Sequence, residues 1–110
     1  MSLPHVPNVI SGAPASTLPL LDVHDPATGT VIARVPLSGA HELDLAVQAA
    51  HRAQPAWAAL PIKERVQVFY RYKALLERDI DALAALISRE NGKIDSEARA
   101  EVLKAAELSE

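Results

Sequence analysis

The sequence predicts an α/β segment in which one β-hairpin precedes about four α-helices. Two short β-prone runs flank the turn sequence DPATG at residues 25–29. From Ser38 onward the apolar residues recur every three or four positions, which is the period of an amphipathic helix. A chain of 110 residues with 49% hydrophobic and 23% charged residues is ordinary for a globular protein and long enough to bury a core.

Residues 1–20 are rich in proline. Pro4, Pro7, Pro14 and Pro19 each lack a backbone donor and disfavour helix in the residue before them. We therefore expect residues 1–20 to be an extended or mobile arm, with the folded region beginning at residue 21.

The predicted hairpin pairs residues 20–26 with residues 30–36. Pro26 presets φ in the turn, and Gly29 can adopt positive φ. The sequence offers no third strand here, and a two-stranded hairpin is marginal in water on its own. We therefore expect the hairpin to join a larger sheet that is formed by other parts of the protein.

The first two predicted helices begin near residues 38 and 61. Ser38 suits the N-cap of the first helix, and Pro55 should kink or end this helix because it cannot donate to the carbonyl of His51. Pro61 suits the first turn of the second helix. The expected inner faces comprise Leu43, Ala46, Val47, Ala50 and Trp57 in the first helix, and Ile62, Val66, Phe69, Tyr70, Lys73 and Leu76 in the second.

Either Asp79 or Asp81 could cap the third helix, and Gly92 should end it because glycine readily takes the left-handed conformation. The fourth helix should follow Asp95, and its small apolar residues suit close packing. No Gly, Asn or Pro stop follows Leu108, so we expect the chain to be a truncated piece of a larger protein. The inner faces comprise Ile80, Leu83, Ala84 and Ile87 in the third helix, and Ala98, Val102, Ala105 and Ala106 in the fourth.

Charge and composition exclude several kinds of function. The formal net charge is −3, with 11 Lys and Arg interleaved among 14 Asp and Glu, so no basic surface is offered to nucleic acid or anionic lipid. The chain has no cysteine, and therefore no disulfide, thiolate metal site or cysteine nucleophile. Its apolar runs are too short to span a membrane, and its N-terminus lacks a secretory pattern. We expect a cytoplasmic protein.

Three stretches of the sequence, HDPATGTVIARVPLS, AVQAAHRAQPAW and ERVQVFYRYKALLERDIDALAALISRENGK, together resemble the N-terminal region of the aldehyde dehydrogenase superfamily. The superfamily pattern is an Asn-Pro-Ala-Thr-Gly turn, a Pro-Ala-Trp helix, a helix ending in Leu-Leu-Glu and a Glu-x-Gly-Lys turn. Asp25 replaces the usual Asn and can form a similar side-chain turn bond. Within the superfamily, the sequence of these stretches is most similar to that of the CoA-acylating methylmalonate-semialdehyde dehydrogenases.

The resemblance implies the α/β aldehyde dehydrogenase fold, with residues 21–110 forming the N-terminal part of an NAD-binding domain. It implies oxidation of a methylmalonate- or malonate-semialdehyde-like aldehyde with NAD, through a cysteine thioester whose acyl group passes to CoA. It also implies a homodimer or homotetramer. The cysteine and the cofactor-binding and oligomerisation parts would lie beyond Glu110, so we expect this segment alone to be inactive and to bind no cofactor or metal.

Lys104 is the candidate substrate-binding residue. In the similar group the last helix reads Gly-Glu-Val-x-Arg-Gly, and its Arg is thought to recognise the substrate carboxylate. Glu101 and Val102 match this pattern, and Lys104 takes the place of the Arg. Lysine is a point charge where arginine offers a bidentate fork, so either the carboxylate is held differently or the aldehyde differs. The alternative is a solvated Lys104 paired with Glu101 or Glu107, each three residues away.

The other polar and aromatic residues receive structural interpretations. Lys93 follows a glycine, but Ile94 and a preceding helix do not fit a phosphate-binding loop, so Lys93 should neutralise the carbonyl end of the third helix or contact another part of the enzyme. The histidines His5, His24, His41 and His51 lack metal-ligand spacing and should be exposed. The aromatic residues Trp57, Phe69, Tyr70 and Tyr72 should pack.

Two other classes of function remain open. One is a non-acylating aldehyde dehydrogenase, because the N-terminal region does not distinguish the two chemistries. The other is an independent small helical interaction module with no enzymatic activity. Such a module would unfold cooperatively as a monodisperse species, whereas a segment of a larger protein would expose unsatisfied surfaces.

Overall fold

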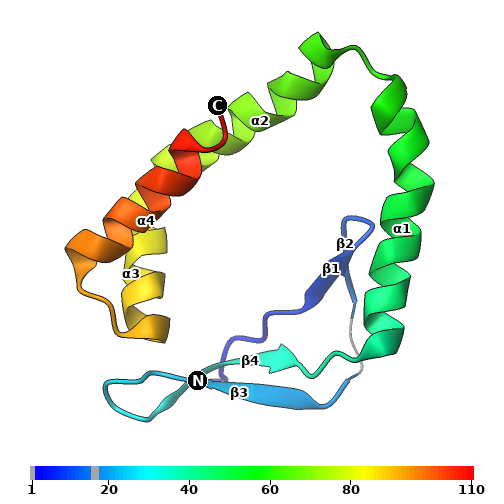
Figure 1. Cartoon of the computed structure of the whole chain (residues 1–110). Helices are drawn as coiled ribbons and strands as arrows, with labels where there is room; N and C mark the ends of the chain where they lie inside the picture. Colours follow the sequence, from blue (N-terminus) through cyan, green and yellow to red (C-terminus); the bar gives the residue numbers. More distant parts are fainter. Residues whose placement is uncertain (1, 16–17) are drawn as a thin grey trace. The chain divides into compact units, whose positions relative to one another are not determined.

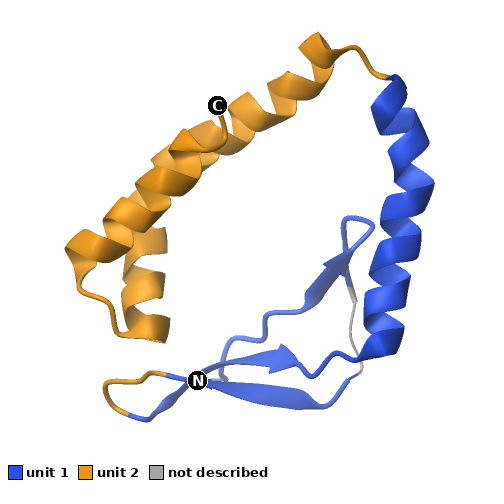
Figure 2. Ribbon diagram, in the orientation of Figure 1, with its two compact units in different colours: residues 1–24, 29–59 blue, residues 25–28, 60–110 orange. Residues whose placement is uncertain are grey.

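The computed structural model of the chain describes residues 2–15 and 18–110 (Figure 1). Within these residues, strands precede a run of helices, which confirms the predicted order of elements. Their bounds are β1 Asn8–Ile10, β2 Ala13–Ala15, β3 Leu20–His24, β4 Val31–Pro36, α1 Ala40–Ala59, α2 Ile62–Arg78, α3 Ile80–Asn91 and α4 Asp95–Glu107. They form two compact units (Figure 2): unit 1 contains residues 1–24 and 29–59, and unit 2 contains residues 25–28 and 60–110.

Strands β3 and β4 form the predicted hairpin, with one irregularity. Val23 lies opposite Ala33 in the antiparallel register, but His24 lies opposite Val31. Ile32 is therefore the extra residue of a β-bulge. Consecutive residues of a regular strand face opposite sides, whereas here Ile32 and Ala33 are both buried. The bulge thus allows two neighbouring apolar side chains to avoid water.

The hairpin turn follows the predicted chemistry. The Asp25 carboxylate accepts a hydrogen bond from the backbone N–H of Ala27 at 2.8 Å, which is the side-chain turn bond expected of an Asp at this position. Gly29 adopts a φ of 73°, in the left-handed region that glycine enters without a steric cost. Local residue chemistry is therefore sufficient to explain this turn.

The arm contains a hairpin that the sequence analysis missed. Strands β1 and β2 pair in antiparallel register, with Asn8 opposite Ala15 and Ile10 opposite Ala13. Ser11 and Gly12 connect them with φ angles of 56° and 75°, the positive values of a two-residue hairpin turn. A Ser-Gly pair between short apolar runs is a turn signal that the surrounding prolines obscured.

Strands β3 and β4 form a two-stranded sheet, as predicted, and one isolated parallel bridge links His5 of the arm to Arg34 of β4. The backbone of Arg34 donates to the carbonyl of Pro4 and accepts from the N–H of Val6, both at 2.9 Å, so arm residues 4–6 run parallel to β4. Because both backbone groups of Arg34 point away from β3, Arg34 and Asp22 form a non-hydrogen-bonded cross-strand pair with adjacent side chains. Their Nε and Oδ1 atoms lie 2.8 Å apart.

Helix α1 differs from the prediction at its start and at its proline. The helix begins at Ala40, and Gly39 rather than Ser38 precedes it, because Leu43 N–H donates to the Gly39 carbonyl at 3.2 Å. Pro55 does not end the helix, which continues to Ala59. The fixed φ of proline is compatible with helical geometry, so its local cost is the lost donor and crowding of the preceding turn.

Small side chains bring the helices of unit 2 close together. Helix α4 buries Ala98, Val102 and Ala106, which recur every four residues and therefore share one face. Ala84 of α3 is fully buried as well. Ion pairs flank this packing: Arg99 Nη1 lies 2.6 Å from Asp81 Oδ1. The predicted inner face of α4 is confirmed for Ala98, Val102 and Ala106, whereas Ala105 is exposed.

The helix ends of unit 2 are close to their predicted positions. Pro61 is the residue before α2 rather than its first helical residue, with a ψ of 145°. Asp79 precedes α3, but its carboxylate binds the Arg78 guanidinium and caps no backbone N–H. Gly92 ends α3 with a φ of 81°, and its N–H donates to the Ser88 carbonyl at 2.9 Å. A Cβ at Gly92 would lie 3.2 Å from the Pro26 ring.

The buried residues are mostly small. Among the described residues they comprise Ile32, Ala33, Ala84, Ala98, Val102 and Ala106. Large apolar side chains are exposed instead, including Leu43 at 66% and Leu103 at 51%. The aromatic residues predicted to pack are also exposed in this chain, by between 37% for Trp57 and 56% for Tyr70. The apolar surface that drives folding thus remains largely in contact with water.

We expect the 110-residue chain alone to unfold over a broad temperature range and to bind a dye that fluoresces on apolar surface. The reason is that its large apolar side chains are exposed while mostly small ones are buried. Circular dichroism, calorimetry and dye fluorescence measure these properties. A single sharp transition with equal calorimetric and van 't Hoff enthalpies, and no dye binding, would show a self-sufficient domain.

Candidate functional site

Lys104, the residue singled out by sequence, lies on an exposed part of α4. Its Nζ atom lies 3.0 Å from Glu107 Oε2, one turn further along the helix. The two side chains are 60% and 65% exposed, so the ion pair between them is worth little and exchanges readily. Of the two glutamates within helical reach of Lys104, the structure pairs it with Glu107.

Glu101, the other glutamate within reach, is bound to Lys93. Lys93 Nζ donates to Glu101 Oε2 at 2.7 Å across the turn between α3 and α4. This hydrogen bond, with the charges of Glu101 and Glu97, raises the pKa of Lys93 above its ordinary value. The sequence predicted that Lys93 neutralises the carbonyl end of α3 or contacts another part of the enzyme; its side-chain partner within this chain is Glu101 of α4.

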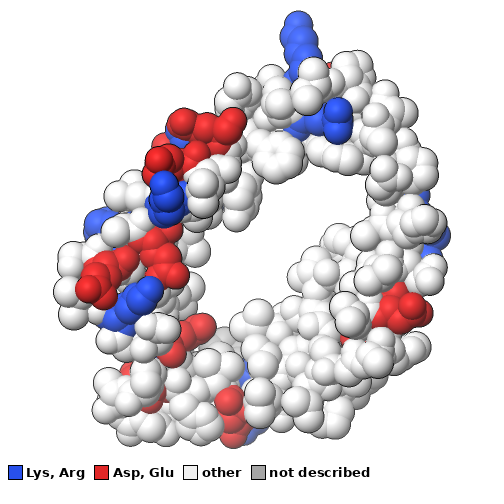
Figure 3. Space-filling view, in the orientation of Figure 1, with Lys and Arg blue, Asp and Glu red and all other residues white. Residues whose placement is uncertain are grey.

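Charges of both signs are intermixed along this part of the chain. Figure 3 shows acidic and basic side chains alternating over the helices of unit 2. Lys73 Nζ lies 2.5 Å from Glu110 Oε1 and 3.4 Å from Glu77 Oε1, which joins α2 to the residues after α4. A mixed surface of this kind creates no strong field of one sign for steering a ligand.

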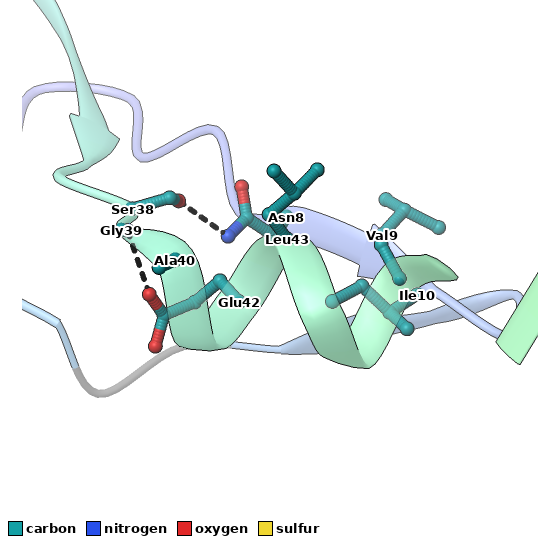
Figure 4. A pocket seen from close by; sticks show the side chains of 9 residues that line it. Asn8, Val9, Ile10, Ser38, Gly39, Ala40, Glu42 and Leu43 are labelled. Carbon is teal, nitrogen blue, oxygen red and sulfur yellow. Dashed lines mark hydrogen bonds between the residues drawn. The ribbon is translucent and has the colours of Figure 1, made fainter. Parts of the chain in front are cut away.

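A pocket lies within unit 1, between β1 and the first turns of α1 (Figure 4). Asn8 Nδ2 donates to Ser38 Oγ at 2.8 Å, and Gly39 N–H donates to Glu42 Oε2 at 2.7 Å. The Glu42 carboxylate thereby occupies the positive end of α1, as in one half of a capping box. The lining residues are Asn8, Val9, Ile10, Ser38, Gly39, Ala40, Glu42, Leu43 and Ala46.

An apolar groove lies within unit 2, where α2, α3 and α4 meet. Its floor is aliphatic, and the carboxylates of Glu90 and Glu101 lie among its lining residues. The groove has no cationic side chain, and an acidic rim disfavours an anionic ligand. The lining residues are Leu76, Leu83, Leu86, Ile87, Glu90, Glu101, Val102 and Ala105.

The described residues do not fit the pyrophosphate of NAD. A dinucleotide is usually held at a helix N-terminus by free backbone N–H groups. Here the first turn of every helix from α1 to α4 carries an acidic residue, namely Glu42, Glu64, Asp81, and Asp95 with Glu97. A carboxylate at these positions repels phosphate, and Glu42 also occupies the N–H of Gly39.

The remaining candidates supply no site. The four histidines are exposed, as predicted. Residues 2–15 and 18–110 contain no group of three His, Asp or Glu side chains arranged to hold a metal ion. In the same part of the chain, no helix combines the length and apolar character required to cross a membrane.

Sequence reasoning missed two arrangements that the structure shows. The Asn8–Ser38 hydrogen bond joins residues thirty positions apart, and neither residue carries a pattern that predicts the other. The partner of Glu101 was also missed, because helical spacing points to Lys104 while the turn after Gly92 brings Lys93 nearer. The available signal was the position of Lys93 directly after Gly92 and two residues before the start of α4.

The comparisons with known proteins define the family. A model of the aldehyde dehydrogenase family matches residues 13–110. The chain therefore belongs to the aldehyde dehydrogenase family, as the resemblance in its sequence implied. The observed strands and helices agree with the N-terminal portion of that fold.

Named relatives indicate which members of the family are similar. Malonate-semialdehyde dehydrogenase 3 of Geobacillus kaustophilus is 44% identical over 88 residues, covering 80% of this chain and 18% of the relative. The acylating, mitochondrial methylmalonate-semialdehyde/malonate-semialdehyde dehydrogenase of Mus musculus is 40% identical over 90 residues, covering 82% of this chain and 17% of the relative. The chain thus spans about a fifth of the length of these relatives.

A solved structure matches nearly the whole chain. It is a candidate methylmalonate-semialdehyde dehydrogenase of Sinorhizobium meliloti in complex with NAD, with a TM-score of 0.89 and 30% identity. The match covers 98% of this chain and 22% of that protein.

We expect the chemical shift of the Gly39 amide proton to change as Glu42 is protonated. The midpoint of this change should lie below the ordinary glutamate pKa of about 4.3. The backbone N–H of Gly39, followed by that of Glu42 itself, lowers the pKa of the Glu42 carboxyl. The hydrogen bond is therefore complete above pH 4.3 and is lost as the pH falls through the lowered value.

A pH titration followed by heteronuclear NMR measures this midpoint. The control variant Asp44→Asn removes a carboxylate two residues further along α1 and should leave the midpoint unchanged. A midpoint at or above 4.3, or a Gly39 amide that still titrates in Glu42→Gln, would contradict the assignment.

Proposed function

We propose that this chain is the N-terminal region of an NAD-dependent aldehyde dehydrogenase that converts a malonate- or methylmalonate-semialdehyde-like aldehyde to an acyl-CoA. The observation that carries the proposal is the 44% identity, over 80% of the chain, to a relative named for malonate semialdehyde. The complex of the similar Sinorhizobium meliloti protein with NAD supports NAD as the cofactor of this protein. The complete protein would be a homodimer or homotetramer.

The proposed reaction proceeds through a cysteine that is absent from these 110 residues. Its thiolate adds to the aldehyde carbon, loss of hydride from that carbon gives an enzyme thioester, and the thiol of CoA then takes the acyl group and releases the cysteine. When bound, NAD supplies the hydride acceptor. Because the described residues do not fit the dinucleotide, we assign its binding to other parts of the complete protein.

The contribution of residues 1–110 is then structural, except that Lys104 binds the substrate. The β3–β4 hairpin adds to a larger sheet, and the exposed apolar side chains of α1 and α2 become buried against the rest of the protein. Helix α4 packs against its neighbours through small residues and holds Lys104 at the substrate entrance. There its ammonium binds the carboxylate that distinguishes these semialdehydes from simple aldehydes.

The proposal is tested on the product of the reading frame that continues beyond codon 110. We expect that product, incubated with malonate semialdehyde, NAD and CoA, to form NADH and acyl-CoA in equal amounts. A stop codon after codon 110 would overturn the proposal and favour a small interaction module. Formation of NADH with a free carboxylic acid in place of the thioester would show a non-acylating dehydrogenase.

Within that protein, we expect Lys104→Ala to raise the KM for malonate semialdehyde about tenfold and to change kcat little. Loss of a charge-assisted hydrogen bond made equally in the ground and transition states affects binding and leaves the chemical step unchanged. Lys104→Arg should keep or lower KM, because a guanidinium binds a carboxylate with two donors.

Propionaldehyde, which has no carboxylate, should show an unchanged KM in both variants. Lys63→Ala removes an exposed lysine from the first turn of α2 and is the matched control. If Lys104→Ala leaves KM and kcat unaltered, Lys104 has no place in the substrate site.

A further inference from the structure

Glu101 lies between two lysines that compete for its carboxylate. Lys104 is three positions further along α4, at a distance that normally allows pairing. The structure instead shows Glu101 hydrogen-bonded to Lys93, eight positions earlier, while Lys104 turns the other way to Glu107. Lys104 therefore has one carboxylate partner rather than two.

Shielding and geometry explain why Glu101 pairs with Lys93. The Lys93 side chain is 37% exposed, against 60% for Lys104, so its ion pair is less weakened by water. The Lys93–Glu101 distance of 2.7 Å is also shorter than the Lys104–Glu107 distance of 3.0 Å. The left-handed Gly92 reverses the chain immediately before Lys93, which fixes its approach to α4.

We propose that Lys93 is a positioning residue that holds Glu101 away from Lys104 and so keeps Lys104 available to an anionic ligand. If Glu101 were released, Lys104 would lie between carboxylates three residues before and after it. An incoming carboxylate would then have to displace both. With Glu101 engaged, the ligand displaces only the exposed Glu107. The inference rests on the proposed function in taking this ligand to be the carboxylate of the substrate.

Kinetics of the complete protein test the inference through rescue. We expect Lys93→Ala to raise the KM for malonate semialdehyde about two- to fivefold, the range that corresponds to an exposed ion pair, with kcat unchanged. Adding Glu101→Gln should restore KM because the competing carboxylate is gone. Adding Glu97→Gln instead is the matched control, since it restores the same net charge without removing the competitor, and it should not restore KM.

A raised KM in Lys104→Ala together with an unchanged KM in Lys93→Ala would overturn the inference. So would a raised KM that Glu101→Gln fails to rescue, because it would show that the bridge has a structural role only. Equal rescue by Glu97→Gln would also overturn it, since it would assign the effect to net charge.

A second measurement needs no substrate and therefore separates this inference from the proposed function. The rate at which an amine-acylating reagent labels Lys104 in the complete protein is read by mass spectrometry, with Lys63 as the internal reference. A second carboxylate paired with Lys104 hinders the approach of the reagent to its Nζ atom, so Lys93→Ala should slow labelling about two- to fivefold and Glu101→Gln should restore it. Unaltered labelling would refute the competition, whereas slowed labelling in Lys93→Ala together with an unchanged KM in Lys104→Ala would refute only the substrate role of Lys104.

Discussion

The close approach of α4 to its neighbours depends on the absence of large side chains along one face of that helix. Ala98, Val102 and Ala106 are buried there, and Ala84 of α3 is fully enclosed. A larger side chain at any of these positions would push the helices apart, since protein interiors leave no spare volume. The short ion pairs between α3, the turn and α4 require the same separation. The placement of Lys104 is therefore a consequence of packing on the opposite side of its helix.

Features set by local residue chemistry could be predicted from the sequence. The Asp25 turn bond and the positive φ of Gly29 and Gly92 follow from the conformations open to those residues. The buried face of α4 follows from a four-residue spacing of small side chains. The family was also recognisable, because its turn and helix motifs occur in order. These features need no knowledge of which distant residues meet.

Features that depend on a choice between partners could not be predicted. The prolines of the arm predicted an extended or mobile segment and gave no sign of its pairing with β4. That pairing uses the carbonyl of Pro4 and the N–H of Val6, which proline chemistry does not remove. Ser38 has the preferred N-cap side chain, but Asn8 engages its hydroxyl and Glu42 satisfies Gly39. Glu101 likewise had two lysines within reach, and only the geometry of the turn decides between them.

The pairing of Arg34 with the arm has a consequence for aggregation. With residues 4–6 on one side and β3 on the other, β4 has partners on both of its edges, which leaves β3 as an outer strand. Leu20 and Leu21 of β3 are about half exposed. An outer strand that carries exposed leucines is a template for strands of other molecules. The same edge through which this hairpin can extend a sheet is thus the site where separately produced copies would begin to associate.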